Sequence, residues 1–179
     1  MSKDPSMLGA PTHERHPDDF YPTPSWCTEV LLRHWRPRGV VWEPAAGDGA
    51  IVDVIREYFY PTWATDLHQR RSDIQGGVDF FAAIPPVTEF SIVTNPPNNL
   101  AEEFLREALK LTSNVAMLFR HEFDCAASRA DLYRLPNFVG KIVLTKRPRW
   151  IADSTGSPRH NWAWSIWDQD RTPRWAWDQ

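Results

Sequence analysis

Short apolar segments that run into polar or glycine-rich turns constrain the fold of this chain more than any other feature. Val40-Val41-Trp42 is followed by the turn 43–49, the segment 62–65 ends at Asp66, and 90–94 ends at Asn95. Helix-like segments separate these strand-like ones, and such alternation predicts a mostly parallel sheet with helices on both faces. Ligands of open sheets bind at the carboxyl ends of the strands, so these turns are the first candidates for a functional site.

The apolar periodicity predicts seven strands and four helices. The expected strands are 40–42, 62–65, 78–81, 90–94, 114–119, 138–145 and 161–167. The expected helices are 25–35, 51–59, 100–111 and 126–135, the first of them capped by Ser25. Because the last two strands are joined by a loop without a helix, we expect the last strand to be antiparallel. The predicted fold class is α/β, a three-layer sandwich around a mostly parallel seven-stranded sheet.

Length and composition predict one domain. The chain has 179 residues, 42% of them hydrophobic, which is enough for one core and too little for two. We expect a flexible N-terminal arm over 1–18, a domain over 19–168 and a C-terminal tail over 169–179. No apolar run has the length of a signal peptide or a membrane span. The two cysteines, Cys27 and Cys125, form no CxxC motif, which favours a reducing, cytoplasmic location.

The net charge of −3 is unevenly divided along the chain. Residues 1–114 carry ten basic and sixteen acidic side chains, whereas residues 115–179 carry ten and seven. A polyanionic partner would therefore meet the C-terminal third. The candidate phosphate contacts are Arg120, Arg129, Arg134, Lys141, Lys146, Arg147, Arg149 and Arg159. Scattered arginines are also common on solvated faces, so these residues either contact phosphates or simply face the solvent. His121, Glu122 and Asp124 are either substrate contacts or part of a solvated turn.

The turns after the strands have the features of a nucleoside-binding site. Gly47 and Gly49 allow the backbone to bend tightly and to approach a ligand, although the third glycine of the dinucleotide fingerprint is absent. Asp66 can accept hydrogen bonds from both hydroxyls of a ribose. Asp79 beside Phe80 suits an adenine, whose amino group donates while its face stacks. Each feature is weak alone, but the ordered set on separate strand ends is a strong signal.

These residues resemble the class I S-adenosylmethionine-dependent methyltransferases, which are Rossmann-like, and in particular the amino-methylating DNA methyltransferases of phage and prophage. The resemblance covers about 19–168 and includes Tyr21-Pro22-Thr23-Pro24, Glu43-Pro44-Ala45-Ala46-Gly47-Asp48-Gly49, Asp66, Asp79-Phe80 and Thr94-Asn95-Pro96-Pro97. It implies S-adenosylmethionine as the cofactor, with Thr23 at the methionine carboxylate. The residues implied to bind the cofactor are Tyr21, Thr23, Glu43, Pro44, Ala45, Gly47, Gly49, Asp66, Asp79, Phe80 and Asn95.

The resemblance implies that Asn95, Pro96 and Pro97 are catalytic. The lone pair of an exocyclic amino nitrogen is delocalised into the ring, so catalysis needs acceptors that draw the amino hydrogens aside. Asn95 offers a side-chain oxygen, and the stiff proline pair can aim the Pro96 carbonyl at the same nitrogen. The alternative is a strand-ending turn without chemistry.

One position departs from the family pattern. The family has an aromatic residue after the two prolines to stack on the base, whereas this chain has Asn98. Trp150 is a candidate substitute ring, and packing on the sheet edge is an equal alternative. The predicted substrate-binding residues are Asn98, Arg147, Arg149, Trp150 and Arg159. His13 and His16 lie in the expected arm, so we expect no metal.

The predicted function is methylation of an exocyclic amino nitrogen, with adenine N6 in DNA favoured. The chain leaves no room for a separate recognition domain, so we expect a relaxed sequence preference. RNA or a protein glutamine is an alternative acceptor, and a catalytically silent protein that binds S-adenosylmethionine is an alternative of another class. Every enzymatic interpretation requires Gly47 and Asn95 to face one cleft.

Overall fold

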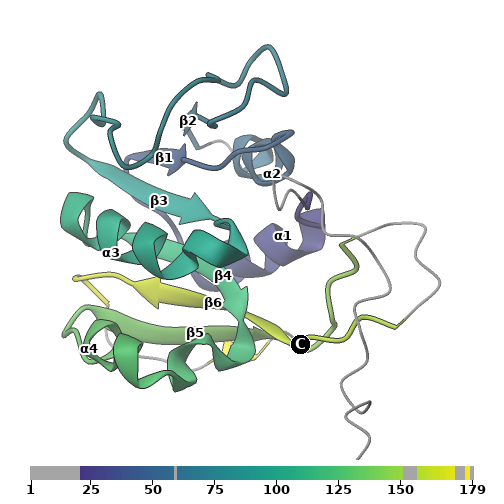
Figure 1. Ribbon diagram of the computed structural model, residues 1–179, viewed down its shortest axis with the longest axis vertical. Helices are drawn as coiled ribbons and strands as arrows, with labels where there is room; N and C mark the ends of the chain where they lie inside the picture. Colours follow the sequence, from purple (N-terminus) through teal and green to yellow (C-terminus); the bar gives the residue numbers. More distant parts are fainter. Residues whose placement is uncertain (1–20, 59, 151–156, 172–175, 178–179) are drawn as a thin grey trace, which may run out of the picture.

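The protein is built around a mixed sheet with helices packed against it (Figure 1). The computed structural model describes residues 21–58, 60–150, 157–171 and 176–177. Six strands form most of the sheet: β1 Val40–Glu43, β2 Thr62–Ala64, β3 Phe90–Thr94, β4 Val115–Arg120, β5 Phe138–Leu144 and β6 Trp162–Trp167. A two-residue strand, β7 Ala176–Trp177, lies beside β5.

The strand order is β2-β1-β3-β4-β6-β5-β7. Strands β2, β1, β3 and β4 are parallel, and β6 is antiparallel to both of its neighbours, β4 and β5. The expected antiparallel pairing of the strands 138–145 and 161–167 is confirmed. The order reverses between β1 and β3, and a crevice forms at the carboxyl edge of an open sheet at such a point.

The helices divide between the two faces of the sheet because side chains alternate along each strand. Val41 packs with α1 (Ser25–His34) and α2 (Ala50–Glu57) on one face. Trp42, the next residue of β1, packs with α3 (Ala101–Leu111) and α4 (Ala130–Tyr133) on the other. Both clusters are formed by residues distant in sequence.

The expected strand at 78–81 is wrong. These residues form a turn, in which Asp79 Oδ1 accepts a hydrogen bond from the Phe81 amide at 3.0 Å. The place beside β2 is taken by Gln75, which makes a single parallel bridge with Thr65. The apolar character of the segment comes from Phe80, which packs against α3 instead of pairing in the sheet.

Three further expectations need correction or extension. Ser25 is the first residue of α1 and caps nothing, and the carbonyl of Pro24 accepts from the Cys27 amide instead. The expected helix 126–135 is split into a 3-10 turn, η3 (Ala127–Arg129), and the single turn of α4. Part of the expected tail adds to the sheet as β7, and the expected arm lies outside the described residues. No described helix combines the length and the apolar character needed to cross a bilayer.

Candidate active site

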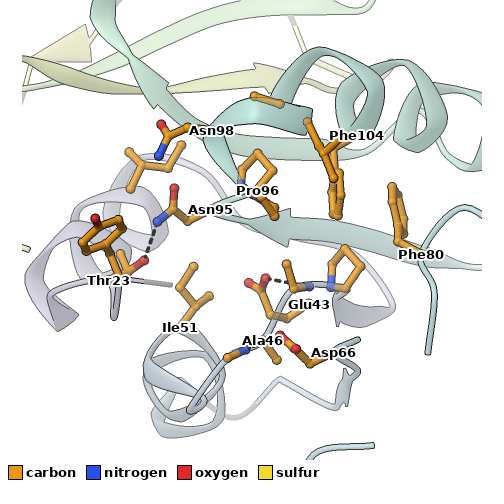
Figure 2. A pocket seen from close by; sticks show the side chains of 18 of the residues that line it. Thr23, Glu43, Ala46, Ile51, Asp66, Phe80, Asn95, Pro96, Asn98 and Phe104 are labelled. Atoms are coloured by element: carbon orange, nitrogen blue, oxygen red, sulfur yellow. Dashed lines mark hydrogen bonds between the residues drawn. The ribbon is translucent and has the colours of Figure 1, made fainter. Parts of the chain in front are cut away.

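The polar turns after β1, β2 and β3 open into one cavity of about 1300 Å³ at the carboxyl edge of the sheet (Figure 2). Gly47 and Asn95 both line it, so they face a common cleft, as an enzymatic site requires. The predicted site residues that line the cavity are Tyr21, Thr23, Glu43, Pro44, Ala45, Gly47, Asp66, Asp79, Phe80, Asn95, Pro96, Pro97, Asn98 and Trp150. They come from every turn that the sequence pattern singled out.

Asp66 holds the glycine turn in place. Gly47 has a left-handed backbone with φ of 56°, and its amide donates to Asp66 Oδ2 at 2.8 Å. The His68 amide donates to the other oxygen, Oδ1, at 2.7 Å. Each carboxylate oxygen has a second lone pair, so Asp66 can support the turn and still accept hydrogen bonds from a ligand.

Glu43 is a buried carboxyl at the centre of the site. Its Oε1 accepts from the Thr94 hydroxyl at 2.5 Å and from the Ala45 amide at 3.3 Å. Its Oε2 is buried and has no hydrogen-bond partner among the described residues. Burial raises the pKa of this carboxyl to about 8. A buried acceptor without a partner is a position where a ligand that carries a donor or a positive charge would be stabilised.

The Asn-Pro-Pro turn is fixed by the segment that precedes α1. Asn95 Nδ2 donates to the Thr23 hydroxyl at 3.2 Å, a contact drawn in Figure 2. Thr23 and Pro96 are buried, and the Pro97 carbonyl accepts from the Leu100 amide at 3.0 Å. Because Thr23 occupies the amide nitrogen of Asn95, the side-chain oxygen is the end of that group left for a ligand.

The predicted adenine pair lies on the wall beneath α3. Phe80 is only 3% exposed and stacks on Phe104, with ring centroids 4.6 Å apart. Asp79 is exposed at the rim. Phe104 and the half-exposed Phe81 also line this wall, and sequence reasoning did not single them out. Their signal was available, because Phe81 follows the Asp79-Phe80 pair directly and Phe104 lies on the apolar stripe of α3.

Four predicted site residues, all in the described part of the chain, do not line the cavity. Gly49 is the residue before α2, with φ of 89°, and the Arg71 guanidinium covers it from outside. Arg147 donates to the Asn161 side chain at 2.8 Å and to the Pro158 carbonyl at 3.2 Å. Arg149 and Arg159 are exposed outside the cavity.

The cavity continues past Asn95 toward β4 and β6. We call this part the β4 half, lined by Leu118, Phe119, Arg120, Glu122, Phe123, Arg129, Trp150, His160 and Trp162. Trp150 packs edge-on against Trp162, with ring centroids 4.6 Å apart, so it is both a packing residue and part of the wall. Phe119 and Phe123 were not predicted, although they lie at and beyond the end of a predicted strand, where the carboxyl-end rule could have found them.

The described residues contain no group of three or more His, Cys, Asp or Glu side chains that could hold a metal ion.

The fold is shared with class I S-adenosylmethionine-dependent methyltransferases. A protein of Listeria monocytogenes assigned to that class matches with a TM-score of 0.53 and 10% identity, over 86% of this chain and 61% of the Listeria chain. The 23S rRNA methyltransferase ErmE matches with a TM-score of 0.57 and 18% identity, over 86% of this chain and 71% of that one.

A third solved structure is a modification subunit assigned to a type I restriction enzyme of Vibrio vulnificus. It matches with a TM-score of 0.58 and 12% identity, over 86% of this chain and 45% of the subunit. The chain thus spans less than two thirds of the Listeria and Vibrio proteins. No protein-family model and no curated protein sequence matches the chain. Identities at this level establish a common fold.

Proposed function

We propose that this protein is an S-adenosylmethionine-dependent methyltransferase that acts on an exocyclic amino nitrogen of a nucleic-acid base, with adenine N6 in DNA favoured. The observation that carries the proposal is the position of Asn95. Its side chain lies in one cavity with Gly47 and Asp66, and its free oxygen faces away from Thr23. The same cavity extends beyond Asn95 into the β4 half, which leaves room for an acceptor.

The residues around the glycine turn fit a nucleoside with a charged amino-acid tail. Asp66 would accept from ribose hydroxyls, and Asp79 with the phenylalanines beneath α3 would hold the adenine. The partnerless Oε2 of Glu43 suits a positively charged part of the ligand. S-adenosylmethionine carries both a sulfonium and an ammonium group, and when bound it supplies an electrophilic methyl group.

The catalytic work falls to positioning and to hydrogen-bond acceptors. Asn95 Oδ1 and the Pro96 carbonyl would accept the two amino hydrogens, which returns the lone pair to the nitrogen. The freed lone pair could then accept the methyl group, with the thioether as the leaving group, and the nitrogen would lose a proton to solvent. No covalent bond to the protein is needed.

A nucleic acid is favoured over a protein acceptor because the β4 half carries Arg120, Arg129 and His160 at its wall. Two of the proteins that share the fold are named for work on RNA or for restriction modification. The choice of DNA among nucleic acids rests on the resemblance of the Asn-Pro-Pro turn to that of the amino-methylating DNA methyltransferases. We expect a relaxed sequence preference, as the sequence alone suggests.

The test is transfer of label from S-adenosylmethionine carrying a radioactive methyl group. DNA, RNA and protein are offered separately, and the modified nucleoside or residue is then identified. We expect N6-methyladenine in DNA, and Asn95→Ala should lower transfer by about a hundredfold or more, as loss of a transition-state hydrogen-bonding group does. Asn137→Ala is the matched control, since Asn137 does not line the cavity.

Each other outcome contradicts part of the proposal. Label in RNA or in glutamine would keep the enzyme class and replace the acceptor. Cofactor binding without transfer to any of the three would identify a silent binding protein. Absence of binding to both S-adenosylmethionine and S-adenosylhomocysteine would refute the proposal as a whole.

A further inference from the structure

Three side chains form a continuous stack on the wall of the β4 half. The rings of Phe119 and Phe123 are parallel within 9°, with centroids 4.0 Å apart. The guanidinium carbon of Arg129 lies 4.0 Å from the centroid of the Phe123 ring. All three residues line the cavity, and the Arg129 side chain remains 23% exposed. The stack therefore ends on a charged plane that solvent, or a ligand, can reach.

Arg129 is held in this orientation by hydrogen bonds. Its Nε donates to Glu102 of α3 at 3.2 Å, and its Nη1 donates to the carbonyl of Phe123. Glu102 is itself fixed by Arg106 at 3.0 Å. A guanidinium bound on two sides loses little freedom when a further group stacks on it, so this surface is pre-organised for binding.

The turn that carries Phe123 is anchored from below. This turn, η2 (His121–Cys125), rests on Lys141 of β5, which is 4% exposed. Lys141 Nζ donates to the His121 carbonyl at 2.5 Å and to both carboxylate oxygens of Asp124 at 2.9 and 3.0 Å. A buried ammonium with three acceptors fixes the turn relative to the sheet.

The stack lies beside Asn95 and on the side away from Gly47. Strands β3 and β4 are parallel, and Thr94 pairs with Met117, so the residues that follow Met117 run alongside the Asn-Pro-Pro turn. The side chain at the position after the prolines, Asn98, is exposed and has no ring. Position 98 therefore offers no aromatic surface to an acceptor that lies between Asn95 and β4.

We propose that the acceptor base stacks on the Arg129 guanidinium and extends the stack of Phe119, Phe123 and Arg129. The inference rests on the proposed function and names the residues that hold its substrate. Guanidinium planes stack on nucleic-acid bases, and a positive plane also favours a nearby phosphate backbone. A glutamine amide has no ring to use this surface, so the stack favours a nucleic acid as the acceptor.

The experiment measures binding of a short fluorescein-labelled single-stranded DNA that contains adenines. Its partner probe has abasic residues in place of the adenines. We expect the wild type to prefer the base-bearing probe by about tenfold, as base stacking contributes in other proteins. Arg129→Lys keeps the charge but loses the plane, so it should remove most of the preference and leave the affinity for the abasic probe unchanged.

Arg56→Lys is the matched control because Arg56 likewise binds a carboxylate, that of Asp73, but does not line the cavity. It should keep the wild-type preference. Phe123→Leu removes the ring that packs against the inner face of the Arg129 guanidinium, so it should reduce the preference, although less than Arg129→Lys does. Circular dichroism and cooperative melting verify that each variant is folded.

The outcomes separate this inference from the proposed function. If the wild type shows no preference, or if both cavity variants retain it, the stacking role of Arg129 is refuted. Calorimetric binding of S-adenosylhomocysteine and transfer of label are measured independently on the same proteins. Their failure in the wild type would refute the proposed function, whatever the two probes show.

Discussion

The side-chain amide of Asn95 donates to the hydroxyl of Thr23 at 3.2 Å, across 72 positions of sequence. The contact joins the turn after β3 to the segment that begins α1. It orients the Asn95 amide, because only its oxygen is then directed at the rest of the cavity. The two motifs thus form one unit, although each was predicted for a separate task.

Thr23→Val is expected to lower the turnover number by about fivefold, since the lost hydrogen bond contributes about 1 kcal/mol and the Asn95 amide is then free to rotate. Thr23→Ser keeps the hydroxyl and should restore most of the activity. Steady-state kinetics of methyl transfer provides the measurement. Equal turnover in the valine and serine variants would mean that Asn95 is oriented by another group.

Asp66→Asn is expected to weaken the binding of S-adenosylhomocysteine by ten- to a hundredfold, because the carboxylate accepts charge-assisted hydrogen bonds and also holds the Gly47 amide. Isothermal titration calorimetry measures the affinity. Asp73→Asn is the control, since Asp73 is a half-exposed partner of Arg71 outside the cavity. Similar losses in both variants would contradict a ligand role for Asp66.

Glu43 should make the stability of the fold depend on pH. The folded protein holds the proton up to a pKa of about 8, whereas the unfolded chain releases it near the model value of 4.5. The unfolded state is therefore increasingly favoured as the pH rises from 4.5 to about 8, and the penalty is constant above that range.

Glu43→Gln keeps the acceptor for Thr94 and Ala45 and removes the titration. Its melting temperature should exceed that of the wild type by an amount that grows between pH 4.5 and about 8. Melting curves over that range measure the difference. Parallel pH profiles of the two proteins would show that burial does not shift the Glu43 carboxyl in this way.

Gly49→Ala is expected to destabilise the fold by about 1–3 kcal/mol, because the backbone is left-handed and the new Cβ would lie 2.5 Å from the Arg71 guanidinium. Gly77→Ala has a similar φ of 72° but meets nothing within 4 Å, so it should cost only about 1 kcal/mol. Chemical denaturation compares the two. Since Gly49 does not line the cavity, the folded variant should bind S-adenosylhomocysteine as the wild type does.

Most elements of the sheet could be predicted because their side chains are apolar at strand spacing and their ends carry glycine, proline or aspartate. The segment 78–81 misled the prediction for a physical reason. Phe80 is buried by packing on α3, and periodicity alone does not distinguish an apolar residue in a strand from one in a turn. The spacing of apolar residues indicates which side chains are buried. Whether a segment joins the sheet also depends on the strand that it would pair with.

The residues around the glycine turn could also be predicted to lie in one cavity. They directly follow parallel strands, and the carboxyl ends of such strands lie at one edge of the sheet. The β4 half could not be predicted, because Phe123 and Arg129 come together through contacts with Phe119 and Glu102 that no spacing in the sequence encodes. Gly49 is the reverse case, because it belongs to a motif that was assigned to the site but does not line the cavity. Its left-handed backbone, with φ of 89°, favours glycine at this position, and the Arg71 guanidinium packs against it.

The cavity residues fall into two groups along the chain, and the two groups meet at Asn95. The lining residues from Tyr21 to Phe104 surround the glycine turn and the Asn-Pro-Pro turn, and those from Leu118 to Trp162 form the β4 half. Recombination within α3 would therefore replace the β4 half as a block and leave the glycine turn, Asp66 and the Asn-Pro-Pro turn intact. Substitutions confined to the later part of the chain could thus reshape the β4 half without altering the walls around the glycine turn.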